Sequence, residues 1–373
     1  MKRKALPVLL LCFYVLLLPE VKAQVRKEIR IPDILGYQTL KCDFHVKTVF
    51  SDGQVWPTVR VEEAWREGLD AIAIADLVDY QTNDEQLAGD RNRSAEIAKP
   101  LADLMGIVLI RGAEIAPNTS PGHLTAVFVR NANLLERESW WDACVEAKEQ
   151  GAFLFMNDPA LDTRQADSPV WGPEHTRLLN AGIVKGIEIC TDKGFSQEAV
   201  AWSNEKSLVI LGNSDIQGAS NEIYKEPGKN RPITLVFALE KTESAIKAAV
   251  FDNRTAVYFN ETLVADRRFL TPIFLNAVQV KSKKLNLANQ DIKYLQLYNN
   301  SDIPFKLKQR QPSIGLNAPK EITLLPNRTV LVELEGISDE LARTPMLKLY
   351  YEATNLLTKK GEKLPVNIDV PNL

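Results

Sequence analysis

Between residues 37 and 265, short apolar runs alternate with amphipathic stretches, and this alternation constrains the fold more than any other feature. The apolar runs have the lengths of buried strands: Thr39–Val46, Ala71–Leu77, Gly106–Ile115, His123–Val129, Ala152–Met156, Ile183–Cys190, Leu208–Gly212 and Thr234–Leu239. The amphipathic stretches have helical periodicity: Val59–Glu67, Ser94–Met105, Trp140–Gln150, Gln197–Lys206 and Ser244–Phe251. Strands that alternate with helices in this way form a mainly parallel sheet. We therefore expect an α/β domain over residues 24–267, either a closed barrel or an open sheet.

The pattern changes after about residue 268, where short strand-like runs are separated by turns rich in Asn, Asp, Pro and Gly. These runs are Val278–Lys284, Tyr294–Asn299, Ile322–Leu325, Thr329–Leu334 and Met346–Tyr351. No helix longer than two turns is expected here, apart from a short one near Asp339–Ala342. We therefore predict a small all-β, sandwich-like domain over residues 268–373.

The first 23 residues have the pattern of a secretory signal peptide. Three basic residues at positions 2–4 precede an apolar run from Ala5 to Leu18, and small residues at Val21 and Ala23 suit signal-peptidase cleavage. The apolar run is short for a membrane span, although a permanent N-terminal anchor is the alternative. We expect a periplasmic or secreted protein that begins at Gln24 and keeps no stable membrane anchor.

Charge and cysteine content argue against two classes of protein. Of the 45 Lys and Arg and the 48 Asp and Glu residues, the signal segment holds four and one, so the mature chain has a formal net charge of −6. This mild acidity argues against nucleic acid as a partner. The mature cysteines Cys42, Cys144 and Cys190 lack the spacing of a disulfide framework, although the sequence allows one disulfide bridge in an oxidising compartment.

Ionisable residues gather where the predicted strands end. Such residues are Asp43, His45, Lys47, Asp52, Asp76, Glu114, His123, Asp158 and Asp215. The C-terminal ends of strands in an α/β fold meet at one rim, where active sites form. A shared cation is the simplest reason for acids and histidines to collect at that rim.

Two motifs at this rim are specific enough to indicate a protein family: DFHVKTVFSDG at residues 43–53 and EGLDAIAIAD at residues 67–76. They resemble the opening of the PHP (polymerase and histidinol phosphatase) family, whose usual pattern is Asp-x-His-x-His-Thr-x-x-Ser-Asp-Gly and then a strand ending Asp-His or Glu-His. The resemblance covers about residues 37–240 and is strongest to the secreted bacterial branch with a C-terminal β domain. It implies a distorted (β/α)7 barrel, with two or three zinc, iron or manganese ions at the strand ends that hydrolyse phosphoesters.

The resemblance is incomplete at the metal ligands. Among the family's ligand positions the chain keeps His45, Asp52, Glu114, His123 and Asp215, but it has Lys47, Leu77, Asp158 and Gln217 where the family generally places histidine. The sub-site at positions 52, 77 and 217 is therefore expected to hold no metal. At the next sub-site we expect the Lys47 ammonium to replace a cation among Asp43, Glu114 and Asp215. Glu114, His123 and Asp158 still form a complete donor set, so at most one tightly bound zinc, manganese or iron ion is expected.

Three hypotheses follow from this pattern. The first is a secreted PHP-fold pseudoenzyme, in which phosphoester hydrolysis is weak or absent because several ligand histidines are replaced. The second is an active phosphodiesterase or phosphatase with a single metal at Glu114, His123 and Asp158, in which Lys47 offsets charge on the phosphoryl oxygens. The third is binding of a ligand or a surface by the C-terminal β domain, which rests on analogy of fold alone.

The resemblance and the chemistry together assign candidate roles. The metal ligands would be His45, Glu114, His123, Asp158 and Asp215, and the catalytic groups would be Lys47, Asp52 and Asp215. Arg91 and Arg93 would bind a small phosphorylated molecule or phosphodiester. Structural alternatives remain open for all of them: hydrogen-bonded core histidines, ion pairs of Glu114 and Asp215 with Lys47 or Arg111, a turn at Ser51–Gly53, and a solvated helix start for the two arginines.

Overall fold

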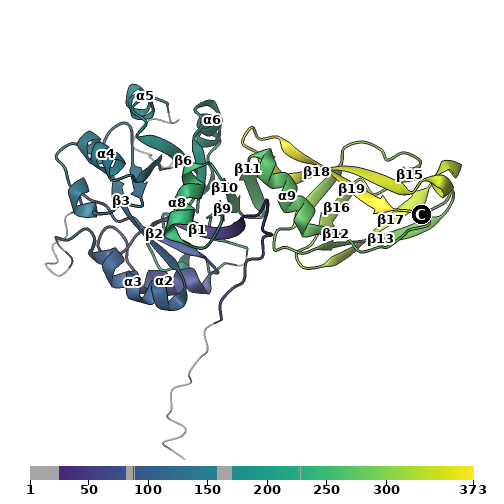
Figure 1. The fold of residues 1–373 in the computed structure, drawn as a ribbon, viewed down its shortest axis with the longest axis horizontal. Coiled ribbons are helices and arrows are strands. Elements are labelled where there is room, and N and C mark those ends of the chain that lie inside the picture. The colour runs from purple at the N-terminus through teal and green to yellow at the C-terminus, as the bar shows by residue number, and fades with distance from the viewer. Residues whose placement is uncertain (1–24, 81–86, 88, 158–169, 227) are drawn as a thin grey trace, which may run out of the picture.

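The structure, a computed structural model, describes residues 25–80, 87, 89–157, 170–226 and 228–373. An α/β domain and an elongated β domain lie side by side along the long axis, and the C-terminus lies toward the far end of the β domain (Figure 1). The predicted fold class, an α/β domain followed by an all-β domain, is confirmed. The predicted signal peptide and Asp158 lie outside the described residues. Within the described ranges, no helix is both long and apolar enough to cross a membrane.

Every apolar run predicted as a strand of the first domain forms one. These strands are β1 Gln38–Val46, β2 Ala71–Ile74, β3 Val108–Ile115, β4 Leu124–Val127, β5 Phe153–Met156, β6 Val184–Thr191, β8 Val209–Gly212 and β9 Ile233–Ala238, with the short β7 Gly194–Phe195 beside β6. The expected parallel pairing is present between β1, β2 and β3 and between β5, β6 and β8. The sheet is nevertheless mixed, because β4 runs antiparallel to β3 and β5, and β9 runs antiparallel to β1. The chain passes from β3 to β4 without a crossover helix, and such a short connection returns it in the opposite direction.

Each of the five stretches predicted to be helical in this domain forms a helix, and the structure adds other, shorter helices. Together they are α2 Pro57–Arg66, α3 Arg93–Met105, η1 Ala132–Leu135, α4 Trp140–Glu149, α5 Pro173–Asn180, α6 Gln197–Glu205, α7 Ser220–Ile223 and α8 Glu243–Phe251. Their ends agree with local chemistry: the hydroxyl of Thr242 accepts a hydrogen bond from the amide of Ala245 at the start of α8, and Gly106 ends α3 with a φ of 66°.

Threonine hydroxyls bring β8 against β9 and β10 (Thr255–Phe259). Oγ1 of Thr234 accepts a hydrogen bond from the amide of Gly212 (2.9 Å) and donates one to its carbonyl (2.8 Å), while Oγ1 of Thr255 donates to the carbonyl of Ile210 (2.9 Å). A Cβ atom at Gly212 would lie 2.3 Å from a methyl group of Val257, so only glycine allows this approach. The ring of strands is therefore closed by side chains where no backbone ladder joins β8 to β9.

The second domain is built from two antiparallel sheets. One contains β12 Val278–Val280, β13 Ile292–Asn299, β17 Thr329–Gly336 and β15 Leu316–Asn317, and the other β16 Glu321–Leu324, β14 Phe305–Gln309, β18 Met346–Thr358 and β19 Lys363–Pro371. Buried and exposed residues alternate along these strands, as expected when one face of each sheet covers a core. The short helix η3, Asp339–Arg343, lies where a short helix was predicted.

One prediction for this region is wrong, since an 11-residue helix, α9 Arg267–Ala277, opens it. The carboxylate of Asp266 accepts a hydrogen bond from the amide of Arg268 and caps the helix start (2.9 Å). Pro272 lies inside the helix and obscures the pattern, because proline has no N–H and usually ends a helix. Here the helix continues through Pro272, because the apolar face that it carries is fully buried.

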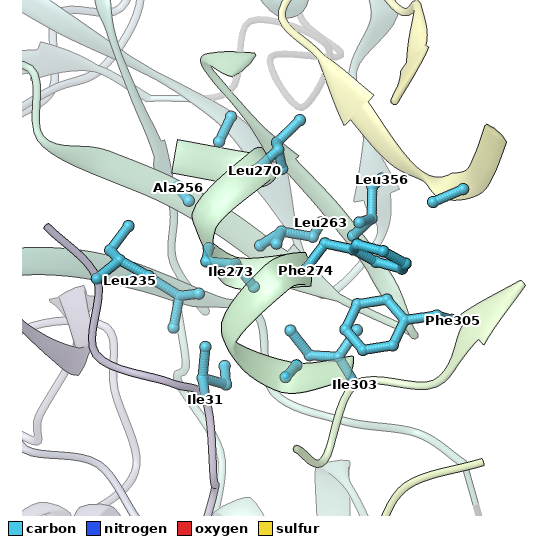
Figure 2. Packing of buried hydrophobic residues seen from close by; sticks show 14 of the residues in the cluster. Ile31, Leu235, Ala256, Leu263, Leu270, Ile273, Phe274, Ile303, Phe305 and Leu356 are labelled. Atoms are coloured by element: carbon cyan, nitrogen blue, oxygen red, sulfur yellow. The ribbon is translucent and has the colours of Figure 1, made fainter. Parts of the chain in front are cut away.

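Helix α9 and strand β18 join the two domains into one body. Leu270, Ile273 and Phe274 of α9 pack between residues of the barrel and residues of the β domain (Figure 2). The end of β18 also pairs in parallel with β11 Thr262–Ala265, which forms a hairpin with β10, so one sheet runs continuously from the barrel into the β domain. The N-terminal part of the structure adds a third link, because the carboxylate of Asp302 accepts a hydrogen bond from the amide of Arg30 (2.7 Å).

Candidate active site

Two β-bulges shape the mouth of the barrel. The register of β1 against β2 shifts between Asp43 and Val46, and that of β6 against β8 shifts between Glu188 and Cys190. Bulges re-aim side chains and are frequent beside active sites. His45 lies within the first bulge, and its Nδ1 is 2.9 Å from Oε1 of Glu188. Glu188 was not among the predicted site residues; its only signal was an acid within an apolar strand.

The side chain of Lys47 is buried in this mouth, with 1% of its surface exposed. Its ammonium contacts Oε2 of Glu114 and donates a hydrogen bond to the carbonyl of Ala75 (2.9 Å). Burial lowers the pKa of Lys47, while the nearby carboxylates of Asp215 and Asp52 oppose that shift. The ion pair between Lys47 and Glu114, expected from the sequence as one alternative, is therefore present.

Glu114 is the centre of the polar network. Its Oε1 lies 2.7 Å from Nδ1 of His123 and accepts a hydrogen bond from the side-chain amide of Asn157 (2.8 Å). Its Oε2 contacts Lys47 and lies 3.4 Å from Nε2 of His45. Both carboxylate oxygens are thus held by neighbouring side chains, as a buried carboxylate requires.

Asp215 lies at the solvent edge of the network, with 32% of its side chain exposed. Its Oδ1 is 3.4 Å from Nε2 of His45, and burial raises its pKa against the effect of His45 and Lys47. Burial disfavours protonation of His45, but the carboxylates of Asp215 and Glu188 outweigh it and raise the pKa of the imidazole. The φ of Asp215 is 47°, a left-handed conformation that costs energy for a non-glycine residue and is common at functional sites.

Asp43 does not share in the Lys47 cluster, and that part of the prediction is wrong. Its carboxylate instead forms an ion pair with Nε of Arg231 (2.7 Å) and accepts a hydrogen bond from the hydroxyl of Ser214 (2.5 Å). Arg231 also pairs with Glu67 (2.9 Å). Arg231 enters from the segment before β9, which is distant in sequence, so the motif around Asp43 gave no indication of it.

The sub-site of Asp52, Leu77 and Gln217 contains no donor set for a metal. The side-chain amide of Gln217 donates a hydrogen bond to Asp52 (2.9 Å), and Leu77 offers only a hydrocarbon side chain. The neighbouring Asp76 accepts hydrogen bonds from Thr48 and Ser51 (both 2.7 Å) and thereby fixes the loop after β1. Ser51 therefore also has the structural role in a turn that the sequence offered as an alternative.

Arg60 of α2 is a second residue that the sequence did not single out. Its guanidinium is fully buried and donates hydrogen bonds to the carbonyls of Lys47 (2.7 Å) and Gln217 (2.6 Å), and to those of Ile216 (3.1 Å) and Gly218 (2.8 Å). It therefore ties the end of β1 to the loop that carries Asp215. Its signal is weak in the sequence, because an arginine on an amphipathic helix is normally solvated.

The structure places Arg91 and Arg93 apart from this network. Arg91 donates to the carbonyl of Tyr80 (2.9 Å) and pairs with Glu136 (3.3 Å), although it also lines a narrow pocket with Asp76 and other residues. Arg93 is exposed at the start of α3. Their proposed contact with a phosphate stays a prediction.

A metal cluster requires several ligand side chains that converge on each ion. Across the described part of the chain, no group of three or more His, Cys, Asp or Glu side chains is arranged to hold a metal ion. The ammonium of Lys47 lies against Glu114, where a bridging ligand would be needed. Asp158, the remaining donor of the third predicted sub-site, is outside the described residues. A multi-ion cluster therefore does not fit the side chains that the structure describes.

Comparisons with known proteins place the chain among solved structures. A two-domain protein from Bacteroides vulgatus ATCC 8482, described as containing a predicted PHP-like metal-dependent phosphoesterase, is 37% identical to the chain with a TM-score of 0.86. The alignment covers 94% of this chain and 100% of that one. A family profile described as an Ig-like domain matches residues 278–369. None of the curated proteins matches the chain.

Two further solved structures are much less similar. A proposed metal-dependent phosphoesterase from Bifidobacterium adolescentis ATCC 15703 is 15% identical with a TM-score of 0.38, over 56% of this chain and 94% of that one. An amidohydrolase from Chromobacterium violaceum, with bound sulfate and no metal, is 12% identical with a TM-score of 0.35, over 48% and 88%. Similarity this low adds nothing on fold or function.

Proposed function

Because this chain belongs to the PHP-like family of metal-dependent phosphoesterases, we propose that it is a family member in which a lysine replaces part of the metal cluster. Phosphoester hydrolysis is then weak or absent. The observation that carries this proposal is the buried ammonium of Lys47 in contact with Glu114. Two more of the predicted ligands lie close by: His45 is beside the carboxylate of Glu114, and the charge of Asp215 acts on Lys47.

The physical reason concerns charge and geometry. A lysine ammonium is a compact single charge that can neutralise Glu114, but it offers no open coordination position for a phosphoryl oxygen. Two-metal hydrolysis needs two cations about 3.5–4 Å apart that stabilise the attacking and the leaving oxygen together. With Lys47 in place, and with Leu77 and Gln217 at the next sub-site, that pair of cations lacks a complete set of ligands.

A small phosphorylated molecule or phosphodiester remains the ligand class that we propose for the mouth of the barrel. The support is the family to which the chain belongs, together with the partial exposure of Asp215 (32%) and His123 (31%) at this mouth. At most one tightly bound divalent ion, zinc, manganese or iron, is proposed. Nucleic acid is not proposed as a partner, because the full chain has a formal net charge of −3.

Elemental analysis of protein purified without added metal, together with hydrolysis of bis(p-nitrophenyl) phosphate and p-nitrophenyl phosphate, tests this function. We expect no more than one equivalent of metal and turnover far below the roughly 1–10³ per second of ordinary enzymes. Two or more equivalents of metal, or an ordinary turnover rate, would contradict the proposal.

Restoring histidines provides the complementary experiment. The variant that combines Lys47→His, Leu77→His, Asp158→His and Gln217→His is expected to gain metal and activity, whereas each single change does little, because ligands of a shared cluster act as a unit. The matched control is the same fourfold variant with Glu114→Gln, which lacks the central ligand. Equal metal content in the two fourfold variants would show that the histidines bind elsewhere.

An active enzyme with one metal at Glu114, His123 and Asp158 is the second candidate. The observation that favours it is the 2.7 Å contact between Nδ1 of His123 and Glu114, with 31% of the histidine side chain exposed. One equivalent of metal together with turnover that His123→Ala abolishes would favour this candidate over the first.

We also propose export and processing between Ala23 and Gln24, which would leave the protein in the periplasm or secreted. The support is the signal-like pattern of residues 1–23, together with the backbone hydrogen bond from Lys27 to Arg66 (2.8 Å), which ties the chain to the barrel soon after that point. Mass spectrometry of protein from the native host should find Gln24 as the first residue. Recovery of the intact chain with Met1 would contradict this.

A further inference from the structure

A second pocket of about 560 Å³ opens at the junction of the two domains, away from the network around Lys47. Its wall is formed by the N-terminal segment near Lys27, the end of α2 at Arg66, the loop near Lys229, and the β-domain loop at Pro304. Pockets of this size are typical of sites for small molecules, which often lie between domains. The domains are fixed to each other by α9 and β18, so the pocket is already formed.

The acidic side chains of this wall are all engaged. Glu67 pairs with Arg231 (2.9 Å), Glu28 with Arg30 (2.8 Å) and Glu261 with Lys306 (2.8 Å). Asp302 accepts hydrogen bonds from the backbone amide of Arg30 (2.7 Å) and the side-chain amide of Asn327 (2.5 Å). By contrast, Arg66 and Lys229 have no ion pair with any described residue. The charge left for a ligand is therefore positive, which favours an anion.

Other groups of the wall favour a polyhydroxylated ligand with one apolar face. Ser220 and Asn221 bring a hydroxyl and a carboxamide, and Tyr258 and Pro304 bring ring surfaces. The hydroxyl of Tyr224 and Nε of Arg66 are buried and have no hydrogen-bond partner among the described residues. A buried polar group without a partner is destabilising, and a ligand or water that reaches it would remove that cost.

From these groups we propose that the junction pocket binds a carboxylated sugar, namely a uronic acid or the end of a short uronic-acid oligosaccharide. The planar guanidinium of Arg66 can bind a carboxylate with two parallel hydrogen bonds, and Lys229 adds a second positive charge. The hydroxyls of the sugar meet Ser220 and Asn221, and the C–H face of its ring lies on Tyr258. A bare anion such as phosphate would leave most of the pocket unfilled.

This proposal is independent of phosphoester hydrolysis. None of the residues that carry it is a predicted metal ligand, and its test involves neither metal nor turnover. A protein without hydrolase activity that binds uronic acids would support this site alone, and a hydrolase that does not bind them would contradict this site alone.

Isothermal titration calorimetry of the full mature protein with glucuronate, galacturonate and digalacturonate tests the site, with glucose, galactose and inorganic phosphate as comparison ligands. We expect binding of at least one uronate, with its neutral counterpart and phosphate at least tenfold weaker. Arg66→Gln should weaken uronate binding at least tenfold, and Tyr224→Phe roughly two- to tenfold, as expected for loss of one hydrogen bond. Melting temperatures establish that each variant is folded.

The matched control is Arg310→Gln, which removes a cation from a different groove, on the β domain. It should leave uronate binding unchanged, because Arg310 lies outside the junction pocket. Absence of binding by every uronate in the millimolar range, equal binding of the neutral sugars or of phosphate, or an equal loss in Arg310→Gln would each overturn the proposal. A folded Arg66→Gln protein with unchanged affinity would overturn it as well.

Discussion

Lys47→Met is the substitution that most directly tests how the barrel mouth is held together. It keeps an unbranched apolar chain but removes the ammonium, so that Glu114, which is 3% exposed, loses its lysine partner. Loss of one partner of a buried pair costs about 3–5 kcal/mol. We expect about 3 kcal/mol, because Glu114 keeps hydrogen bonds to His123 and Asn157 (2.7 and 2.8 Å).

A double-mutant cycle separates the pair from its surroundings. Glu114→Gln alone should leave the lysine buried without a counter-ion, and the Lys47→Met/Glu114→Gln protein should be more stable than the sum of the single changes predicts. The matched control is the pair of Lys99 with Asp103 on α3, which are in contact but have 54% and 61% of their side chains exposed. Because that pair is solvated, its coupling energy should be at most about 1 kcal/mol.

Urea denaturation followed by tryptophan fluorescence is a suitable assay, because all six tryptophans precede residue 203 and thus report on the barrel. The coupling energy of Lys47 with Glu114 should exceed that of Lys99 with Asp103 by at least about 1 kcal/mol, the margin that separates buried from exposed pairs. Equal coupling energies, or a gain in stability from Lys47→Met alone, would show that the lysine does not neutralise the cluster.

Three more predictions concern the framework of the molecule. Burial lowers the pKa of Lys359 from 10.5 to about 8, so the folded state loses this proton first and the stability of the wild type should rise between these pH values. Lys359→Met should therefore be more stable than the wild type near pH 7 and lose that advantage by about pH 10, unlike the exposed control Lys360→Met. Melting curves of the two variants that change alike across this pH range would contradict the reasoning. Phe274→Ala should cost about 3–5 kcal/mol and lower the tryptophan-monitored melting temperature of the barrel, although the residue follows the barrel in sequence, whereas Leu275→Ala, at a position 58% exposed, should change it little. Thr234→Val should cost about 2 kcal/mol in urea denaturation, because it leaves both backbone groups of Gly212 without that hydroxyl; an unchanged midpoint would mean that β8 is held without it.

Much of the site follows from local sequence. The spacing of His45, Lys47 and Asp52 in the first motif, and the positions of Glu114 and His123, predicted which residues meet at the rim, and the family resemblance is confirmed by a relative of 37% identity. The pairing of Lys47 with Glu114 was also foreseen as one alternative. The residues meet because parallel neighbours bring the C-terminal ends of their strands to one edge. His123 reaches the same edge because it precedes β4, which runs antiparallel to its neighbours.

The strands and helices of the first domain were likewise determined by hydrophobic periodicity, since each element buries its own apolar face. The sequence did not determine the direction of β4 and β9, because strand direction depends on how the connections pass over the sheet. It did not indicate α9 either, because the cost of Pro272 is offset only when Leu270, Ile273 and Phe274 are buried between two domains. Nor could it pair Glu188 with His45, or Arg231 with Asp43, across more than 140 residues of chain. A sequence pattern records which groups must be buried, but the partner that neutralises each buried charge is chosen by the tertiary fold, because only there do distant residues come within hydrogen-bonding distance.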